Sequence, residues 1–210
     1  MFIPIEEKLK KIIPDLNQRE EFDHYVKILP KMIANGHAAH QTIPGYDKCK
    51  PEIEAFKWFD DITIPVHGYC DLKGGVIIED KCKFPRRGRL KKDNTRSFST
   101  TKLPEVPDPN HLLQIDFYFS VFELPVYLCY INEETFTVFH ADNCDELKPE
   151  NIKKRIPKII QRCKVRQNLL KISDQANVIK NFIQPDFTNF KWKNDLDENY
   201  LKNAIKFFED

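Results

Sequence analysis

A lysine and two glycines separate two segments that are rich in β-branched and aromatic residues. The first segment, ITIPVHGYCDL, ends at Leu72, and the second, VIIEDKCKF, begins at Val76. Glycines favour a tight turn, and two strands of similar length on either side of such a turn form a hairpin. Pro65 cannot donate a hydrogen bond within a sheet, so the first strand is expected to start late or to lie at a sheet edge. The sequence therefore predicts an antiparallel β-hairpin.

This hairpin is expected to gather three charged side chains on one surface. Asp71 ends the first strand, Glu79 lies in the second, and Lys81 follows it on the same strand. Because side chains alternate along a strand, Glu79 and Lys81 point to one face and Asp80 to the other. Two neighbouring carboxylates repel each other, and Mg²⁺ or Mn²⁺ would relieve that repulsion through oxygen ligands. The alternative interpretation is a set of ordinary exposed strand residues.

Hydrophobic periodicity assigns the rest of the chain to helices and two further strands. The two strands are PVYLCYI and TFTVFHA, which Asn-Glu-Glu separates. Helices are expected in five regions, namely between Glu6 and Ala34 with breaks at Pro14 and Pro30, from Glu52 to Phe59, from a cap at Asn110 to Leu124, from Lys148 to Leu170, and from Glu198 onwards. This order of elements predicts a mixed α/β arrangement around one sheet.

A basic tract follows the second strand of the predicted hairpin. In the stretch 81–92, KCKFPRRGRLKK, seven of twelve residues are Lys or Arg, although the formal net charge of the chain is only +1. Such clusters bind phosphate backbones with salt-dependent affinity, and a solvated surface is the alternative interpretation. Pro85 and Gly88 predict a mobile loop that continues to Thr101. The DNA-binding candidates are Arg86, Arg87, Arg89, Lys91 and Lys92, with Phe84 and Phe98 as candidates for stacking on bases.

Several classes of protein are disfavoured by what the sequence contains. The six cysteines are scattered, the closest two lie twelve positions apart, and they do not follow zinc-ligand spacing. No apolar run approaches the ~20 residues of a membrane-spanning helix, and the first residues, MFIPIEEKLKK, do not resemble a signal peptide. A small-molecule enzyme is disfavoured because no nucleotide-binding glycine loop or Ser-His-Asp pattern stands out. We therefore expect a protein without a membrane partner, located in the cytoplasm, or in the host cytoplasm if a phage encodes it.

Four short motifs, in order along the chain, resemble one nuclease family. GYCDL followed by VIIEDKCK is similar to the core motif of PD-(D/E)XK nucleases, and the Gly68-x-x-Asp71 lead-in resembles the RecB-like branch. Upstream, GHAAH at 36–40 resembles the G-x-x-x-H motif and aligns His40, with His37 as a rival. Downstream, QIDFY at 114–118 resembles the Q-x-x-x-Y motif. Cys82 departs from the threonine that is frequent in this branch, the spacing between the two acids is short, and the iron–sulfur cysteines of some relatives are absent.

The resemblance implies a restriction-endonuclease-like core, in which helices flank a mixed central sheet, and a divalent metal site. Mg²⁺ or Mn²⁺ would be held by Asp71, Glu79, the backbone carbonyl of Asp80 and His40. Lys81 would orient or help deprotonate the attacking water. Gln114 and Tyr118 would line the site from one helix face, since they lie four positions apart.

The expected function is that of a metal-dependent DNA exonuclease acting on single strands or DNA ends in recombination, replication or repair. A structure-specific or restriction-type endonuclease and a non-catalytic DNA-binding module are the alternatives. We expect one nuclease domain over residues 1–210, with a helical N-terminal part to about residue 60, a catalytic core over about 36–145 and a helical C-terminal part from about 146. A homo-oligomer and a recombination or replication partner protein both remain open.

Overall fold

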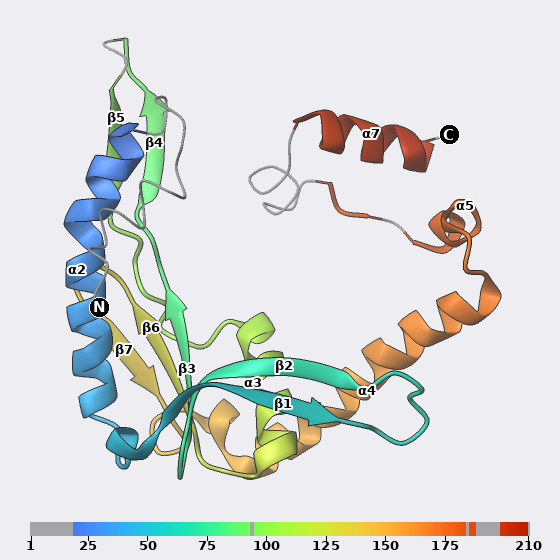
Figure 1. Cartoon of the computed structure of the whole chain (residues 1–210), viewed down its shortest axis with the longest axis horizontal. Coiled ribbons are helices and arrows are strands. Elements are labelled where there is room, and N and C mark those ends of the chain that lie inside the picture. Colours follow the sequence, from blue (N-terminus) through green and yellow to red (C-terminus); the bar gives the residue numbers. More distant parts are fainter. Residues whose placement is uncertain (1–18, 93–94, 184, 188–197, 210) are drawn as a thin grey trace. The chain divides into compact units, whose positions relative to one another are not determined.

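The computed structural model describes residues 19–92, 95–183, 185–187 and 198–209 (Figure 1). The chain divides into two compact units, which are described separately. Among the described residues, unit 1 comprises 19–57 and 66–159, and unit 2 comprises 58–65 and the residues from 160 onwards. The predicted catalytic core therefore lies in unit 1, apart from 58–65. The helical segment expected before residue 19, with its break at Pro14, lies outside the described residues.

Unit 1 is built on a five-stranded sheet with the order β1-β2-β3-β6-β7. The strands are β1 (Lys50–Lys57), β2 (Val66–Lys73), β3 (Ile77–Cys82), β6 (Val126–Ile131) and β7 (Phe136–Phe139). β3 and β6 run parallel, and the other neighbouring pairs are antiparallel, so the sheet is mixed. Both predicted strand pairs are confirmed, and β2 starts directly after Pro65. The fold is thus α/β with helices flanking a mixed central sheet, as the sequence indicated.

Helix α2 (Arg19–Gln41) covers one face of the sheet. Its residues Ile28 and Met32 share a hydrophobic cluster with Ile78 and Ile131 from the strands. The predicted break at Pro30 is wrong, because the helix continues through this exposed proline. A proline inside a helix costs about 3 kcal/mol, whereas each fully buried aliphatic side chain contributes about 1.5–3 kcal/mol. The contacts made on either side of the proline therefore offset its cost.

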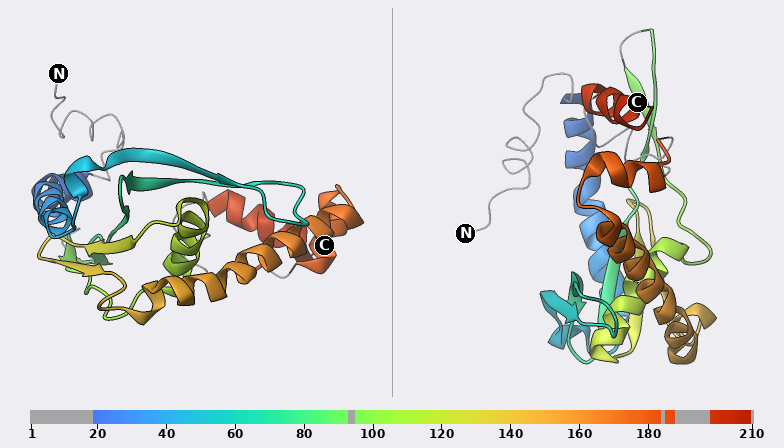
Figure 2. Two further views of the ribbon diagram at one scale, coloured as in Figure 1. Left: turned by 90° about the horizontal axis from the view of Figure 1, so that it is seen from below. Right: turned by 90° about the vertical axis from the view of Figure 1, so that its right-hand side faces the viewer.

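Helix α3 (Pro109–Phe122) lies on the other face, as can be followed in Figure 2. It begins two residues earlier than predicted, because Asp108 and not Asn110 is the N-cap. The Asp108 side chain accepts a hydrogen bond from Asn110 N at 2.8 Å, and Pro109 occupies the first helical position, which prolines favour. The helix ends at Phe122, because the next residue, Glu123, has a φ of 53° that stops the helical path.

Two predicted local structures in unit 1 are wrong. The segment expected as a helix from Glu52 is strand β1, in which Ile53 and Ala55 alternate with exposed glutamates and pair with β2. A period of two in the apolar positions of so short a segment favours a strand over a helix. The expected mobile loop is instead a two-stranded ribbon of β4 (Arg86–Leu90) and β5 (Arg96–Ser99). In Figure 1 this ribbon continues beyond the end of β3, beside the first half of α2.

Two C-terminal helices, α4 (Pro149–Ile172) and α7 (Glu198–Glu209), agree with the prediction, whereas the short helix α5 (Ala176–Ile179) was not predicted. α4 begins in unit 1, and α5 and α7 belong to unit 2. Short 3-10 helices complete the described chain, namely η2 (Tyr46–Lys48), η3 (Asp145–Leu147) and η4 (Lys180–Phe182). None of the helices in the described ranges combines the length and the apolar character needed to span a bilayer.

Candidate active site

The hairpin of β2 and β3 opens at the predicted acidic residues. The two strands pair only at Leu72 with Ile78 and at Lys73 with Ile77. One step further, Asp80 N donates a hydrogen bond to Asp71 Oδ2 at 2.7 Å, and Asp71 N donates to Glu79 Oε2 at 3.4 Å. Carboxylate oxygens thus replace the main-chain ladder where the strands separate. Asp71 and Glu79 lie together there, as the sequence predicted.

The backbone carbonyl of Asp80 is directed toward the same opening. On its other edge, β3 pairs with β6, and the flanking bonds run from Ile77 N to Pro125 O and from Lys83 N to Ile131 O. The N–H and C=O groups of one strand residue point to the same edge. Because Asp80 N reaches the Asp71 carboxylate, the Asp80 carbonyl also faces the β2 edge. Its position is compatible with its predicted role as a metal ligand.

A chain of hydrogen bonds fixes Lys81 beside Glu79. Lys81 Nζ donates to Glu79 Oε1 at 2.6 Å and to Gln114 Oε1 at 2.8 Å. Gln114 Nε2 in turn donates to the hydroxyl of Tyr118 at 2.9 Å, and that hydroxyl donates to the carbonyl oxygen of Tyr69 in β2. The two predicted α3 residues therefore contact the lysine and the β2 backbone. This network places the ammonium group and leaves little rotamer freedom.

Burial of the carboxylates suits a cation at this point. Glu79 is only 1% exposed, and desolvation raises its pKa to about 7, although the Lys81 hydrogen bond and charge oppose the shift. Desolvation also raises the pKa of Asp71, and the nearby Asp80 carboxylate raises it further. Such an environment disfavours two negative charges, and a divalent cation would stabilise both of them. The donor set and the electrostatics therefore fit Mg²⁺ or Mn²⁺.

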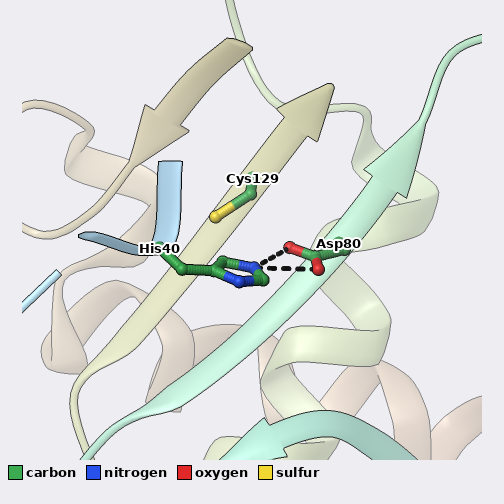
Figure 3. Close-up of side chains that lie close together, drawn as sticks. All are labelled: His40, Asp80 and Cys129. Atoms are coloured by element: carbon green, nitrogen blue, oxygen red, sulfur yellow. Dashed lines mark hydrogen bonds and ion pairs between the residues drawn. The ribbon is translucent and has the colours of Figure 1, made fainter. Parts of the chain in front are cut away.

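His40 lies on the opposite face of β3 from Glu79 and Lys81. Its Nε2 is 3.0 Å from Asp80 Oδ1 and 2.9 Å from Asp80 Oδ2, as Figure 3 shows. The Sγ of Cys129 belongs to the same group, whose donor atoms all lie within 4.8 Å of one another. The expected role of His40 as a ligand beside Asp71 and Glu79 stays a prediction, since its contact is with the Asp80 side chain.

Sequence reasoning missed the Asp80 carboxylate and Cys129. Alternation along β3 already directed Asp80 away from Glu79, toward the face that an amphipathic helix would cover. Its partner on that face depends on the parallel register of β3 and β6, which pairs Asp80 with Cys129. The rival His37 is exposed, and its Nε2 lies 3.0 Å from Gln41 Nε2. His40 is thus the histidine that faces β3.

The predicted DNA-binding residues lie on the β4–β5 ribbon or just beyond its first strand. All five are exposed, namely Arg86, Arg87, Arg89, Lys91 and Lys92. The ribbon rests on α2, because the ring of Phe98 stacks on His24 at 3.9 Å and the ring of Phe84 meets Tyr25 edge-on at 5.7 Å. Phe98 therefore has a structural partner, whereas Phe84 is 44% exposed. The ribbon presents a basic surface on a fixed support.

Comparisons with known proteins add little to this description. No protein-family model matches the chain, and no curated protein matches it. The crystal structure of SSO0001 aligns with 14% sequence identity and a TM-score of 0.38, over 85% of this chain and 76% of that chain. A likeness of this level supports no argument about fold or function.

Proposed function

We propose that the protein is a metal-dependent DNA nuclease with a PD-(D/E)XK core of the RecB-like type. One observation carries the proposal, namely the convergence of Asp71, Glu79 and Lys81 where β2 and β3 separate. A buried acid, a partly buried acid and a fixed ammonium group next to a strand opening are the groups needed for hydrolysis of a phosphodiester. Ordinary surface residues would not be held by hydrogen bonds that run through two strands and a helix.

In this proposal Asp71, Glu79 and the carbonyl of Asp80 hold Mg²⁺ or Mn²⁺. Such an ion, when bound, lowers the pKa of a coordinated water and stabilises charge on the phosphate. Lys81 has three N–H donors, of which Glu79 and Gln114 take two. The third is directed to the attacking water or to a phosphate oxygen, so the lysine orients the nucleophile and offsets charge. His40 contacts the Asp80 side chain. Its direct ligation of the ion is part of the proposal.

The proposed substrate is DNA, either single-stranded or at its ends. The basic ribbon leaves β3 directly after the site, so phosphates on either side of the scissile bond can reach its arginines. Exonuclease action is the form that the resemblance to the RecB-like branch favours. Recombination, replication or repair would be the setting for such an activity.

The test is degradation of end-labelled DNA, single- and double-stranded, linear and circular, with Mg²⁺, Mn²⁺ or EDTA. Lys81→Ala is compared with Lys102→Ala, which removes an exposed lysine that pairs only with Glu105 in the described structure. We expect metal-dependent loss of linear DNA that Lys81→Ala reduces at least about a hundredfold and Lys102→Ala leaves unchanged.

The outcomes separate the alternatives. Cutting of covalently closed circles would make the protein an endonuclease and contradict the exonuclease assignment. Salt-sensitive DNA binding without cleavage under either metal would contradict the catalytic proposal and indicate a non-catalytic DNA-binding module. Cleavage that survives Lys81→Ala would mean that the activity does not come from this site.

A further inference from the structure

We propose that His40, Asp80 and Cys129 form a second metal site, selective for Zn²⁺ or a similar thiophilic divalent cation. The three side chains come from α2, β3 and β6 and meet on the α2 face of the sheet (Figure 3). Their donor atoms, one nitrogen, one carboxylate oxygen and one sulfur, lie within 4.8 Å of one another. This set is distinct from the Asp71 and Glu79 carboxylates of the proposed nuclease site.

The fold brings these donors together through strand register. Asp80 and Cys129 are register partners on the parallel strands β3 and β6, so their side chains point to the same face. α2 runs across that face and ends at Gln41, one residue after His40. The imidazole therefore reaches β3 from the last turn of the helix, and both oxygens of Asp80 lie within hydrogen-bond distance of its Nε2. The fold therefore gathers the three donors in one place before any ion binds.

The distances are close to those of a tetrahedral site. With metal–ligand bonds of about 2.0–2.3 Å, tetrahedral zinc ligands lie about 3.3–3.5 Å apart. The His40–Asp80 separation of 2.9 Å is slightly shorter, whereas the limit of 4.8 Å for the whole group is longer than this spacing by about 1.3 Å. Binding of an ion would therefore draw the three donor atoms closer together.

The donor types decide which ion is favoured. Thiolate and imidazole are preferred by Zn²⁺, whereas Mg²⁺ prefers carboxylates and retains its waters. Cys129 is completely buried, while the His40 and Asp80 side chains are 12% and 24% exposed, so an ion can approach from their side. A cavity of about 380 Å³ adjoins both residues and has room for a water as the fourth ligand. Binding releases the thiol proton to solvent.

Occupancy of this site would regulate the proposed nuclease. This consequence rests on the proposed function, because His40 belongs to both ligand sets, while Asp80 gives its carbonyl to one and its carboxylate to the other. An ion held by Cys129 would keep His40 on the α2 face and withdraw it from the hydrolytic metal. Zn²⁺ would therefore inhibit cleavage that Mg²⁺ supports, and the inhibition would require the thiol.

The test uses Co²⁺ as a spectroscopic probe on the full chain, stripped of metal and kept in a non-thiol reductant. Thiolate ligation produces a charge-transfer band in the near ultraviolet, which carboxylate ligands alone do not. We expect one Co²⁺ per chain to give this band, Zn²⁺ to remove it, and excess Mg²⁺ to leave it. Cys129→Ala should abolish the band, and Asp80→Asn, at a partly exposed position, should weaken Co²⁺ binding at least about tenfold.

The matched control is Cys70→Ala, which removes another completely buried cysteine whose Sγ contacts the carbonyl of Ile53. The band should persist in this variant. A wild-type protein without the band at saturating Co²⁺, or a band that survives Cys129→Ala, would overturn the proposal and leave a simple His40–Asp80 ion pair. Because the band is measured without DNA, failure of the cleavage assay does not affect it. Equal inhibition by Zn²⁺ of wild type and Cys129→Ala would refute the regulatory consequence alone.

Discussion

Replacement of Arg155 by methionine should destabilise unit 1 by breaking a buried ion pair. Arg155 Nε donates to Asp116 Oδ2 at 2.9 Å and its Nη2 to Asp116 Oδ1 at 2.6 Å, and the same Nη2 donates to Glu146 O at 2.6 Å. The Asp116 side chain is 0% exposed. It lies on α3 between Gln114 and Tyr118, so the pair ties the helix that positions Lys81 to the start of α4.

The magnitude follows from the uncompensated charge that remains. Removal of one partner of a buried pair costs about 3–5 kcal/mol. For a domain of 150–250 residues each kcal/mol lowers Tm by about 2–4 °C, which gives a loss of about 6–20 °C for Arg155→Met. A double variant, Asp116→Leu with Arg155→Met, should recover most of this loss, because no buried charge is then left without a partner.

The loss of stability caused by Arg155→Met should also depend on pH. Desolvation raises the pKa of Asp116 above its usual value even though Arg155 opposes the shift, so loss of Arg155 raises it further. An acid whose folded pKa lies above its unfolded pKa binds more protons when folded, and stability then falls as pH rises between the two values. Arg155→Met should therefore be less destabilising at pH 5 than at pH 8.

Urea denaturation at both pH values measures these effects. Lys154→Met is the matched control, because it removes an exposed cation from the same helix and should change stability by less than about 0.5 kcal/mol. A loss below about 1 kcal/mol for Arg155→Met, or the same loss at both pH values, would refute the account of a buried, uncompensated carboxylate.

Three further predictions concern the proposed nuclease site. Gln114→Ala removes one of two acceptors that fix Lys81. It should lower kcat at least about tenfold in the cleavage assay, with little change in KM. An unchanged kcat would show that Gln114 has no positioning role. Tyr118→Phe removes the hydroxyl between Gln114 and the Tyr69 carbonyl. It should lower the free energy of unfolding by about 1–3 kcal/mol, measured by urea denaturation. An unchanged free energy would contradict a stabilising hydrogen bond from this hydroxyl. Arg89→Ala on the ribbon should weaken DNA binding in a salt-dependent way and lower the slope of log affinity against log salt by about 1, and an unchanged slope would exclude a phosphate contact.

The hairpin and its charged residues could be predicted because local signals specify them. The Gly-Gly turn sets which residues face each other, and alternation assigns Glu79 and Lys81 to one face. The spacing of Gln114 and Tyr118 likewise placed them on one side of a helix. Each of these relations depends on residues that are close in the sequence.

The partners of Asp80 could not be predicted in the same way. Cys129 lies opposite Asp80 only because β3 and β6 pair in parallel with one particular register, which packing of the whole unit decides. The prediction of a loop at the basic tract was wrong for a related reason. Its glycine and proline resemble loop signals, yet contacts of Phe98 with His24, far away in the sequence, support a ribbon there. Propensity is a weak guide where distant contacts determine the local structure.

Three successive residues of β3, 79–81, therefore contact three different elements, namely α3, α2 and β2. Glu79 and Lys81 face α3, where Gln114 fixes the ammonium group. The carboxylate of Asp80 contacts His40 on the α2 face. The backbone N–H of Asp80 donates to Asp71 at the β2 edge, and its carbonyl points to the same edge. On a single face, the two carboxylates would repel each other and the lysine would neutralise one of them. Because a strand presents alternate residues to opposite faces and its backbone to the edges, one short segment can supply ligands to both of the metal sites proposed above.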